Sequence, residues 1–187
     1  AKAQYFIGHR YAVGEGVVQD FTQGVFWYRK AAEQGHAMAQ FKLGDCYFSG
    51  EGVPKDEAQA VSWWTKAAEQ DDAEAQFHLG LNYFVGKAFV RDPEKAVFWY
   101  GKAAAQGHAI SQDFLGDCYF NGYGVTKNNV EAYARWKVAG AMGLFLGEKL
   151  TDLEKKLSLD EVNAGKMRLL ELRKEIAFNE WNKQQVK

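Results

Sequence analysis

Histidines are the first residues to examine for chemistry, because a neutral imidazole is a common metal ligand and general base. The chain has four of them, His9, His36, His78 and His108. His9 and His78 have no second ligand three or four residues further on, where the next helical turn would place it. His36 and His108 stand at equivalent places of a repeat, and stacked repeats would hold them roughly 20 Å apart. The sequence therefore predicts no metal site and no cofactor.

Motifs for nucleophilic catalysis and phosphate binding are missing from the sequence. It contains neither G-x-S-x-G nor S-x-x-K, the patterns that carry the serine nucleophiles of α/β-hydrolases and serine β-lactamases. The glycine-rich stretches at residues 14–17, 50–53 and 122–125 follow no apolar strand and complete no dinucleotide-binding or P-loop pattern. We therefore expect turns between helices at these stretches, and a protein that is not an enzyme.

The two cysteines, Cys46 and Cys118, also occupy equivalent places two repeats apart. Stacked repeats would separate them by roughly 20 Å. A disulfide needs Cα atoms within about 7 Å. We therefore expect two unpaired, partly buried thiols that pack as small apolar residues.

Composition narrows the classes of partner. Hydrophobic residues make up 47% of the chain and charged residues 25%, which is typical of a globular protein. The net charge of −1 gives no general attraction to polyanions, so nucleic acid is not expected as a partner. No apolar run approaches the roughly 18 to 20 residues of a membrane span, so membrane insertion is not expected either.

The dominant feature of the sequence is a 36-residue repeat, which divides residues 1–143 into four units at 1–36, 37–72, 73–108 and 109–143. Every unit has Gln at its fourth place, Gly at its eighth and Tyr at its eleventh. This spacing puts the three residues on one face of a helix. Because glycine costs about 1 kcal/mol in a helix, its recurrence indicates that another helix crosses closely there.

A second helix is predicted in each unit after the glycine-rich loop. It begins at a residue type that caps helices, Asp20, Asp56, Asp92 or Asn128. In the first three units it carries an aromatic pair and a Lys-Ala-Ala run, from which the fourth unit departs at Arg135 and Val138. Gly35 and Gly107 suit left-handed C-caps. The alanines would let this helix pack on the first helix of the next unit. The aromatic pairs are expected to fill the core, and a stacking platform for a ligand is the alternative.

The period is lost beyond Gly143. Leu146, Leu150, Leu153 and Leu157 form one helical stripe, and a capping box at residues 158–161 begins a longer helix with Leu169 and Leu172 on one side. We interpret residues 144–187 as C-terminal capping helices, because the last repeat of a stacked array needs a polar outer face.

The pattern A-x-x-x-L-G-x-x-Y-x-x-G-x-G-V, followed by Asp, A-x-x-W and K-A-A-x-Q-G, resembles the Sel1-like repeat family of tetratricopeptide-like solenoids. The resemblance covers residues 1–143 and implies an all-α, right-handed α/α superhelix. It also implies a scaffold or adaptor that binds another protein or peptide, commonly in bacteria, with a periplasmic or secreted location favoured over the cytoplasm. Some relatives have been linked to penicillin binding or hydrolysis, so a weak β-lactam-binding or hydrolysing enzyme is the alternative function.

Residues that differ between units are the candidates for binding. Places two, six, nine and thirteen lie on one side of each first helix, away from the repeated Gln-Gly-Tyr face. The resemblance implies that first helices line the concave side of the superhelix. The predicted peptide-binding residues are Phe6, His9, Lys42, Asp45, His78, Leu81, Phe114 and Asp117. An ordinary helix surface without a ligand is the other interpretation.

Overall fold

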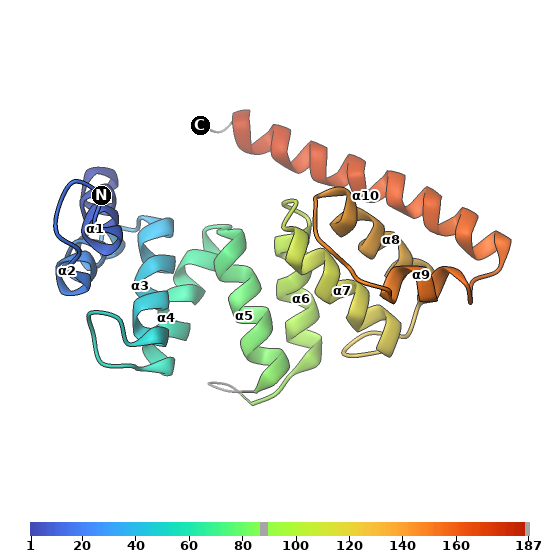
Figure 1. The fold of residues 1–187 in the computed structure, drawn as a ribbon, viewed down its shortest axis with the longest axis horizontal. Helices are drawn as coiled ribbons and strands as arrows, with labels where there is room; N and C mark the ends of the chain where they lie inside the picture. The colour runs from blue at the N-terminus through green and yellow to red at the C-terminus, as the bar shows by residue number, and fades with distance from the viewer. Residues whose placement is uncertain (87–89, 186–187) are drawn as a thin grey trace. The chain divides into compact units, whose positions relative to one another are not determined.

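The computed structural model describes residues 1–86 and 90–185. All regular secondary structure in these residues is α-helical. Residues 87–89 of the third loop, and 186–187 of the predicted cap, lie outside the described part. Figure 1 gives the order of the ten helices found in the described residues. Their bounds are α1 Lys2–Val13, α2 Phe21–Ala32, α3 Ala37–Ser49, α4 Glu57–Glu69, α5 Ala73–Val85, α6 Pro93–Ala104, α7 Ala109–Asn121, α8 Asn129–Ala141, α9 Lys149–Glu154 and α10 Leu159–Gln185. The predicted all-α class and the helix-loop-helix units are confirmed.

The helices form two compact units, whose boundary lies inside α5. The first unit comprises residues 1–79, and the second comprises residues 80–86 and 90–185. In the first unit, Ala31 and Ala32 at the end of α2 pack with Ala39 and Leu43 of α3 in one buried cluster. The small alanines thus bring the second helix of one repeat against the first helix of the next, as the sequence predicts.

Capping side chains begin nearly every repeat helix. Asp20, Asp56, Asp92 and Asn128 each accept a hydrogen bond from the backbone N–H three residues on, at 2.9–3.0 Å, so the four predicted caps are confirmed. The first helices use a different set. The Nδ1 atoms of His36 and His108 accept from Ala39 and Ser111 at 3.2 Å, and an Asp72 carboxylate oxygen does the same for Ala75. Two of the four histidines are therefore helix caps.

The glycine at place eight makes room for an aromatic ring from the second helix of the same repeat. A Cβ atom on Gly44 would lie 2.5 Å from Cδ1 of Trp64, and one on Gly80 would lie 2.5 Å from Cδ1 of Tyr100. Trp64, Tyr100 and Trp136 are almost fully buried, with exposed fractions of 2% or less. The predicted close crossing and the core role of the second aromatic of each pair are both confirmed.

The first aromatic of each pair lies at the edge of the core instead. Trp27, Trp63 and Trp99 are only partly buried. The ammonium group of Lys66 stands 3.9 Å from the Trp63 ring centroid, where the cation and the ring attract each other. These rings therefore shield the helix junctions from water without being enclosed by them.

The glutamine at place four joins consecutive repeats. The Nε2 atoms of Gln40, Gln76 and Gln112 donate to the carbonyl oxygens of Ala32, Ala68 and Ala104 at 2.9–3.1 Å. These carbonyls lie at the ends of the preceding second helices, where each also accepts from the backbone N–H three residues on, at 3.0–3.1 Å. All three glutamine side chains are buried. Each bond thus pairs a buried amide with a carbonyl at the junction between repeats.

The other end of the glutamine amide is tied within its own repeat. Gln34 donates to Oε1 of Gln4, and Gln70 donates to Oε1 of Gln40, both at 2.6 Å. The fourth repeat has Met142 at the corresponding place, and there Arg135 donates to Oε1 of Gln112 at 3.1 Å. Arg135 occupies the place of the tryptophan found in the other repeats, and this bond explains the exchange.

Residues 144–185 pack against α8, in two contacts. Leu172 and Ile176 of α10 are buried with Ala134 and Val138. Leu153 of α9 is buried with Trp136 in a separate cluster. Helix α9 is shorter than the leucine stripe predicts, because Gly147 adopts a left-handed φ of 59° just before it. The division into four repeats over residues 1–143 and C-terminal capping helices over residues 144–187 stays a prediction.

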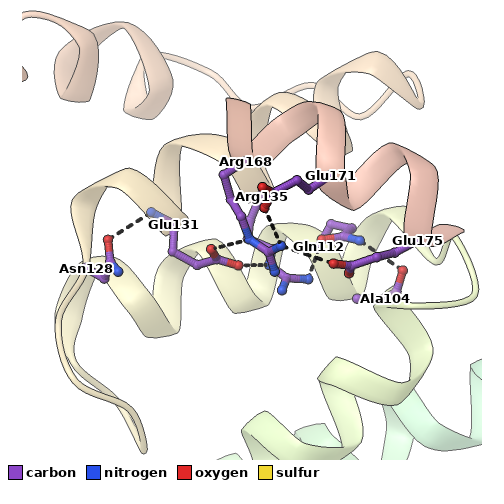
Figure 2. A network of polar contacts seen from close by, with 8 residues as sticks. All are labelled: Ala104, Gln112, Asn128, Glu131, Arg135, Arg168, Glu171 and Glu175. Carbon is purple, nitrogen blue, oxygen red and sulfur yellow. Dashed lines mark hydrogen bonds and ion pairs between the residues drawn. The ribbon is translucent and has the colours of Figure 1, made fainter. Parts of the chain in front are cut away.

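A partly buried ionic network fixes α10 to the fourth repeat (Figure 2). Glu131 accepts from Nε of Arg135 at 2.7 Å through one oxygen and from Nε of Arg168 at 2.9 Å through the other. Its side chain is only 12% exposed, and that of Arg135 is 13% exposed. Arg168 also pairs with Glu171 and Glu175 on α10 at 3.1 Å. The carboxylate of Glu131 thus bridges α8 and α10.

We expect Glu131→Gln to lower the free energy of unfolding by about 3 kcal/mol, because it leaves the buried Arg135 without its counter-charge. Glu171→Gln is the matched control, since that carboxylate is 61% exposed and should contribute less than about 1 kcal/mol. Urea denaturation of both variants measures the difference. Equal losses would show that burial of the network is not what stabilises it.

The close crossing at place eight can be tested with two glycines of the second unit. Gly80→Ala should cost about 1–3 kcal/mol, because the new methyl group would overlap the Tyr100 ring. Gly101→Ala on α6 meets no atom within 4 Å and should be neutral, or stabilising by up to about 1 kcal/mol through helix propensity. Thermal unfolding of the two variants gives the comparison. A tolerated alanine at residue 80 would refute the steric argument.

Candidate protein-interaction surface

The predicted binding residues of the first unit lie on α1, α3 and the start of α5. His9, Lys42 and Asp45 line one surface cavity of about 240 Å³, together with Tyr28 and Cys46. Phe6 is 52% exposed and contacts Tyr5 edge to face, with ring centroids 5.4 Å apart. His78 does not line this cavity. The centroid of its ring lies 4.7 Å from that of the Trp64 ring and 5.4 Å from that of the Phe41 ring instead.

Asp45 has the most perturbed carboxyl group of this surface. Its Oδ1 accepts from Nε1 of Trp64 at 3.1 Å, and its Oδ2 lies 3.5 Å from the Lys42 ammonium. Burial raises the pKa of Asp45 to about 6, although Lys42 and the Trp64 hydrogen bond act to lower it. Desolvation therefore outweighs the two partners. The group changes charge close to neutral pH.

The predicted residues of the second unit lie on α5 and α7. Leu81 is partly exposed. Phe114 packs on the buried Tyr100, with ring centroids 5.3 Å apart. Asp117 accepts from the Lys149 ammonium of α9 at 3.1 Å. Desolvation raises the pKa of Asp117, against the opposing effect of Lys149. Lys149 belongs to this surface but lies outside the repeats, so no feature of the repeat pattern points to it.

The residue at place nine varies in step with the buried aromatic at place 28. Asp45 and Asp117 belong to the repeats that have Trp64 and Trp136. An indole N–H needs an acceptor when it is buried, and Asp45 supplies one for Trp64. The repeats with Tyr28 and Tyr100 have His9 and Leu81 instead. Part of the variation between repeats therefore has an internal cause.

Exposed apolar side chains mark the same face of the first helices. They stand at places two, six and thirteen, between 41% and 53% exposed: Phe6, Val13, Met38, Val85 and Ile110. Polar residues at places six and nine, such as Lys42 and Asp45, lie among them. In each unit the first helices thus present apolar groups beside charged ones.

The remaining reactive groups are passive. Cys46 and Cys118 are unpaired and buried, as predicted. Burial raises the pKa of the Cys46 thiol to about 11 and that of Cys118 to about 12, so both are protonated at neutral pH. Within residues 1–86 and 90–185, no three His, Cys, Asp or Glu side chains are grouped to hold a metal ion. In the same part of the chain, no helix has the length and apolar character needed to cross a membrane.

Comparison with known families and structures gives consistent matches. The Sel1 repeat model matches residues 1–36, 37–72, 73–108 and 109–136. A protective antigen present in uropathogenic Escherichia coli strains, displaying an SLR fold, is 36% identical with a TM-score of 0.86 over 98% of this chain. A Sel1 repeat protein from Oxalobacter formigenes is 33% identical with a TM-score of 0.76, over 95% of this chain and 70% of its own. The search of curated proteins found no match.

Stacked helix-loop-helix units of fixed length define the class of α/α solenoid repeat proteins. The chain belongs to the Sel1 repeat family. Proteins of this family typically act as scaffolds for protein interaction and are generally not catalytic. The chain spans 40% of the length of the Escherichia coli antigen.

The raised pKa of Asp45 predicts an unusual pH dependence. Because the folded-state pKa of about 6 exceeds the ordinary value near 4, this group stabilises the fold most below about pH 4. That contribution is lost as the pH rises through 6. Asp45→Asn should therefore gain about 1–2 kcal/mol relative to the parent protein between pH 4 and pH 7. Urea denaturation across this range measures the gain, and a constant difference would contradict the burial argument.

Proposed function

We propose that this chain is a non-enzymatic interaction module whose first helices bind a peptide or extended segment of another protein. The proposed contact residues of the first unit are Phe6, His9, Lys42, Asp45 and His78. Those of the second unit are Leu81, Phe114 and Asp117. Each unit is proposed to contribute its own part of the binding surface.

The exposed apolar groups on the first helices are the observation that supports this proposal. Phe6, Val13 and Met38 are each about half exposed, so a bound partner could cover them and gain apolar contact. Charged neighbours such as Lys42 and Asp45 stand beside them. Apolar anchors would supply most of the binding energy, and the charged groups would select the partner and steer its approach.

The absence of catalysis is part of the same proposal. The two thiols are protonated at neutral pH, and the carboxylates of the surface are engaged with lysines, Asp45 with Lys42 and Asp117 with Lys149. No specific observation favours β-lactam binding or hydrolysis over protein binding. Purified protein is expected not to turn over nitrocefin.

A peptide library displayed on phage tests the binding surface without a known partner. Peptides enriched on the immobilised protein are measured by calorimetry against the parent protein and Phe6→Ala. We expect Phe6→Ala to weaken binding by about tenfold or more, because it removes an apolar anchor. Circular dichroism should be unchanged, since Phe6 lies outside the buried core.

Phe26→Ala is the matched control, because Phe26 is 46% exposed but lies on α2, a second helix of the same unit. Its affinity for the enriched peptides should equal that of the parent protein. If Phe26→Ala loses affinity while Phe6→Ala retains it, the assignment of binding to the first helices is wrong. Failure to enrich any peptide would count against a peptide-binding function.

A further inference from the structure

Helix α9 packs on the fourth repeat through Lys149, through the apolar side chains of Leu150 and Leu153, and through an ion pair between Glu154 and Lys137 of α8 at 2.8 Å. The ammonium group of Lys149 contacts the carboxylates of Asp113 and Asp117, the latter at 3.1 Å. It also stands 5.1 Å from the ring centroid of Trp136, within the range of a cation–π contact. Leu153, one helical turn later, is 1% exposed and packs in the cluster with Trp136. The two side chains together form a compact recognition element.

The second repeat also has an aspartate and a tryptophan at these two places, but a different side chain packs on the tryptophan. There Asp45 bonds to Trp64, and the ring of His78 from α5 packs on the indole. His78 is the place-six residue of the following repeat. In the fourth repeat, the side chain over Trp136 is Lys149 of the non-repeated α9. A side chain from outside the repeats therefore binds where the face of the fourth repeat would otherwise be open.

Several features make α9 easy to displace. A helix of six residues is not stable on its own, so α9 depends on its contacts. Gly143 and Gly147 adopt left-handed φ angles before it, and the capping box of Ser158 and Glu161 starts α10 separately after it. The side chains of Lys149 and Asp117 are 30% and 42% exposed, and ion pairs in such solvated positions are weak.

Helix α10 does not need α9 in order to stay in place. Its apolar contacts with α8 involve Leu172 and Ile176, and its ionic contact runs through Arg168 and Glu131. Beside α9 there is also free space, a cavity of about 350 Å³ whose lining includes Asp117, Phe120 and Trp136 of the fourth repeat and Lys149 and Leu153 of α9. An incoming segment therefore has room to begin binding before α9 leaves.

We propose that α9 is an internal ligand of the fourth repeat, which masks the Asp117 part of the interaction surface until a partner displaces it. The displacing segment presents a lysine and, four residues later, a leucine on one helical turn. This inference rests on the proposed function of the first-helix face. It adds the chemistry of the partner and the contact that regulates access to it.

The probe is a fluorescent synthetic peptide of residues 146–157, LGEKLTDLEKKL. It is titrated against the parent protein and against the double variant Lys149→Ser/Leu153→Ser, which empties the site within the full chain. The double variant should bind the peptide, and the parent protein should bind it at least about tenfold more weakly because its own α9 competes. Replacing the peptide lysine that corresponds to Lys149 by serine should cost about tenfold. Equal binding to both proteins, or no binding to a folded double variant, would overturn the proposal.

A second measurement covers the case in which the double variant does not fold. Hydrogen exchange of the parent protein should show faster exchange at residues 149–154 than at residues 169–176 of α10. Lys149→Ser alone should accelerate exchange in α9 and leave α10 unchanged. Slow exchange in α9 that matches α10, or joint loss of both helices in Lys149→Ser, would show that α9 is a fixed part of the core and would refute displacement.

The two proposals fail in different ways. Library peptides that depend on Phe6, combined with no binding of the 146–157 peptide, would sink the internal-ligand proposal and leave the proposed function intact. Binding of the 146–157 peptide with no enrichment from the library would support the internal contact and count against a general peptide-binding surface.

Discussion

The hydrogen bond from a buried glutamine to the last carbonyl of the preceding helix is the interaction on which the repeat architecture depends. A buried helix end with unpaired carbonyls is costly, and so is a buried amide without partners. Gln40, Gln76 and Gln112 pair their amides with carbonyls that already accept one backbone N–H from the following turn, so each bond uses the second acceptor site of the carbonyl. The alanines at the helix end are small enough for this approach. The bond therefore fixes the position of each repeat against the one before it.

The second aromatic of each pair fixes the angle inside each repeat in a comparable way. Trp64 and Tyr100 lie over glycines of the first helix, so the two helices can approach without a Cβ atom between them. Because the ring and the glycine are complementary in shape, neither can be changed alone. The nature of the ring also affects the surface, since the buried indole of Trp64 donates to Asp45 on the exposed face. The identity of a buried aromatic residue thus determines part of the surface that a partner would contact.

Much of the fold follows from the sequence, because helix caps and close glycines are local features. Asp56 and Asn128 cap helices by the same short-range bond in any context, so residue type and spacing suffice to predict them. The bond from Gln112 to Ala104 is harder to foresee, because its acceptor is a backbone carbonyl. Every residue has such a carbonyl, so residue types do not indicate which one accepts. Arg135 looks like a lapse in the pattern until the structure places it on Gln112 and Glu131.

The candidate surface was harder to predict for a related reason. The candidate residues differ from one repeat to the next. Such a difference does not distinguish a residue that binds a ligand from one that has a partner within the protein. Asp117 fits both descriptions, since it lies on the exposed face and pairs with Lys149. That contact depends on the course of residues 144–148, which follow no period and no capping pattern. Long-range contacts of this kind need the three-dimensional structure.

The junction bond has a consequence for the number of units such a protein can contain. Its acceptor is a backbone carbonyl, which every residue provides, so one hairpin can follow another without regard to the side chains of its neighbour. Repeats joined in this way are interchangeable. One repeat can be added, removed or exchanged within the array without a change to the hydrogen bond at the junction. The C-terminal end obeys the opposite rule. Arg168 of α10 pairs with Glu131, which in turn pairs with Arg135, and only the fourth repeat combines these last two side chains. Helix α10 therefore packs specifically on the fourth repeat, whereas the junctions between repeats do not depend on which repeat follows.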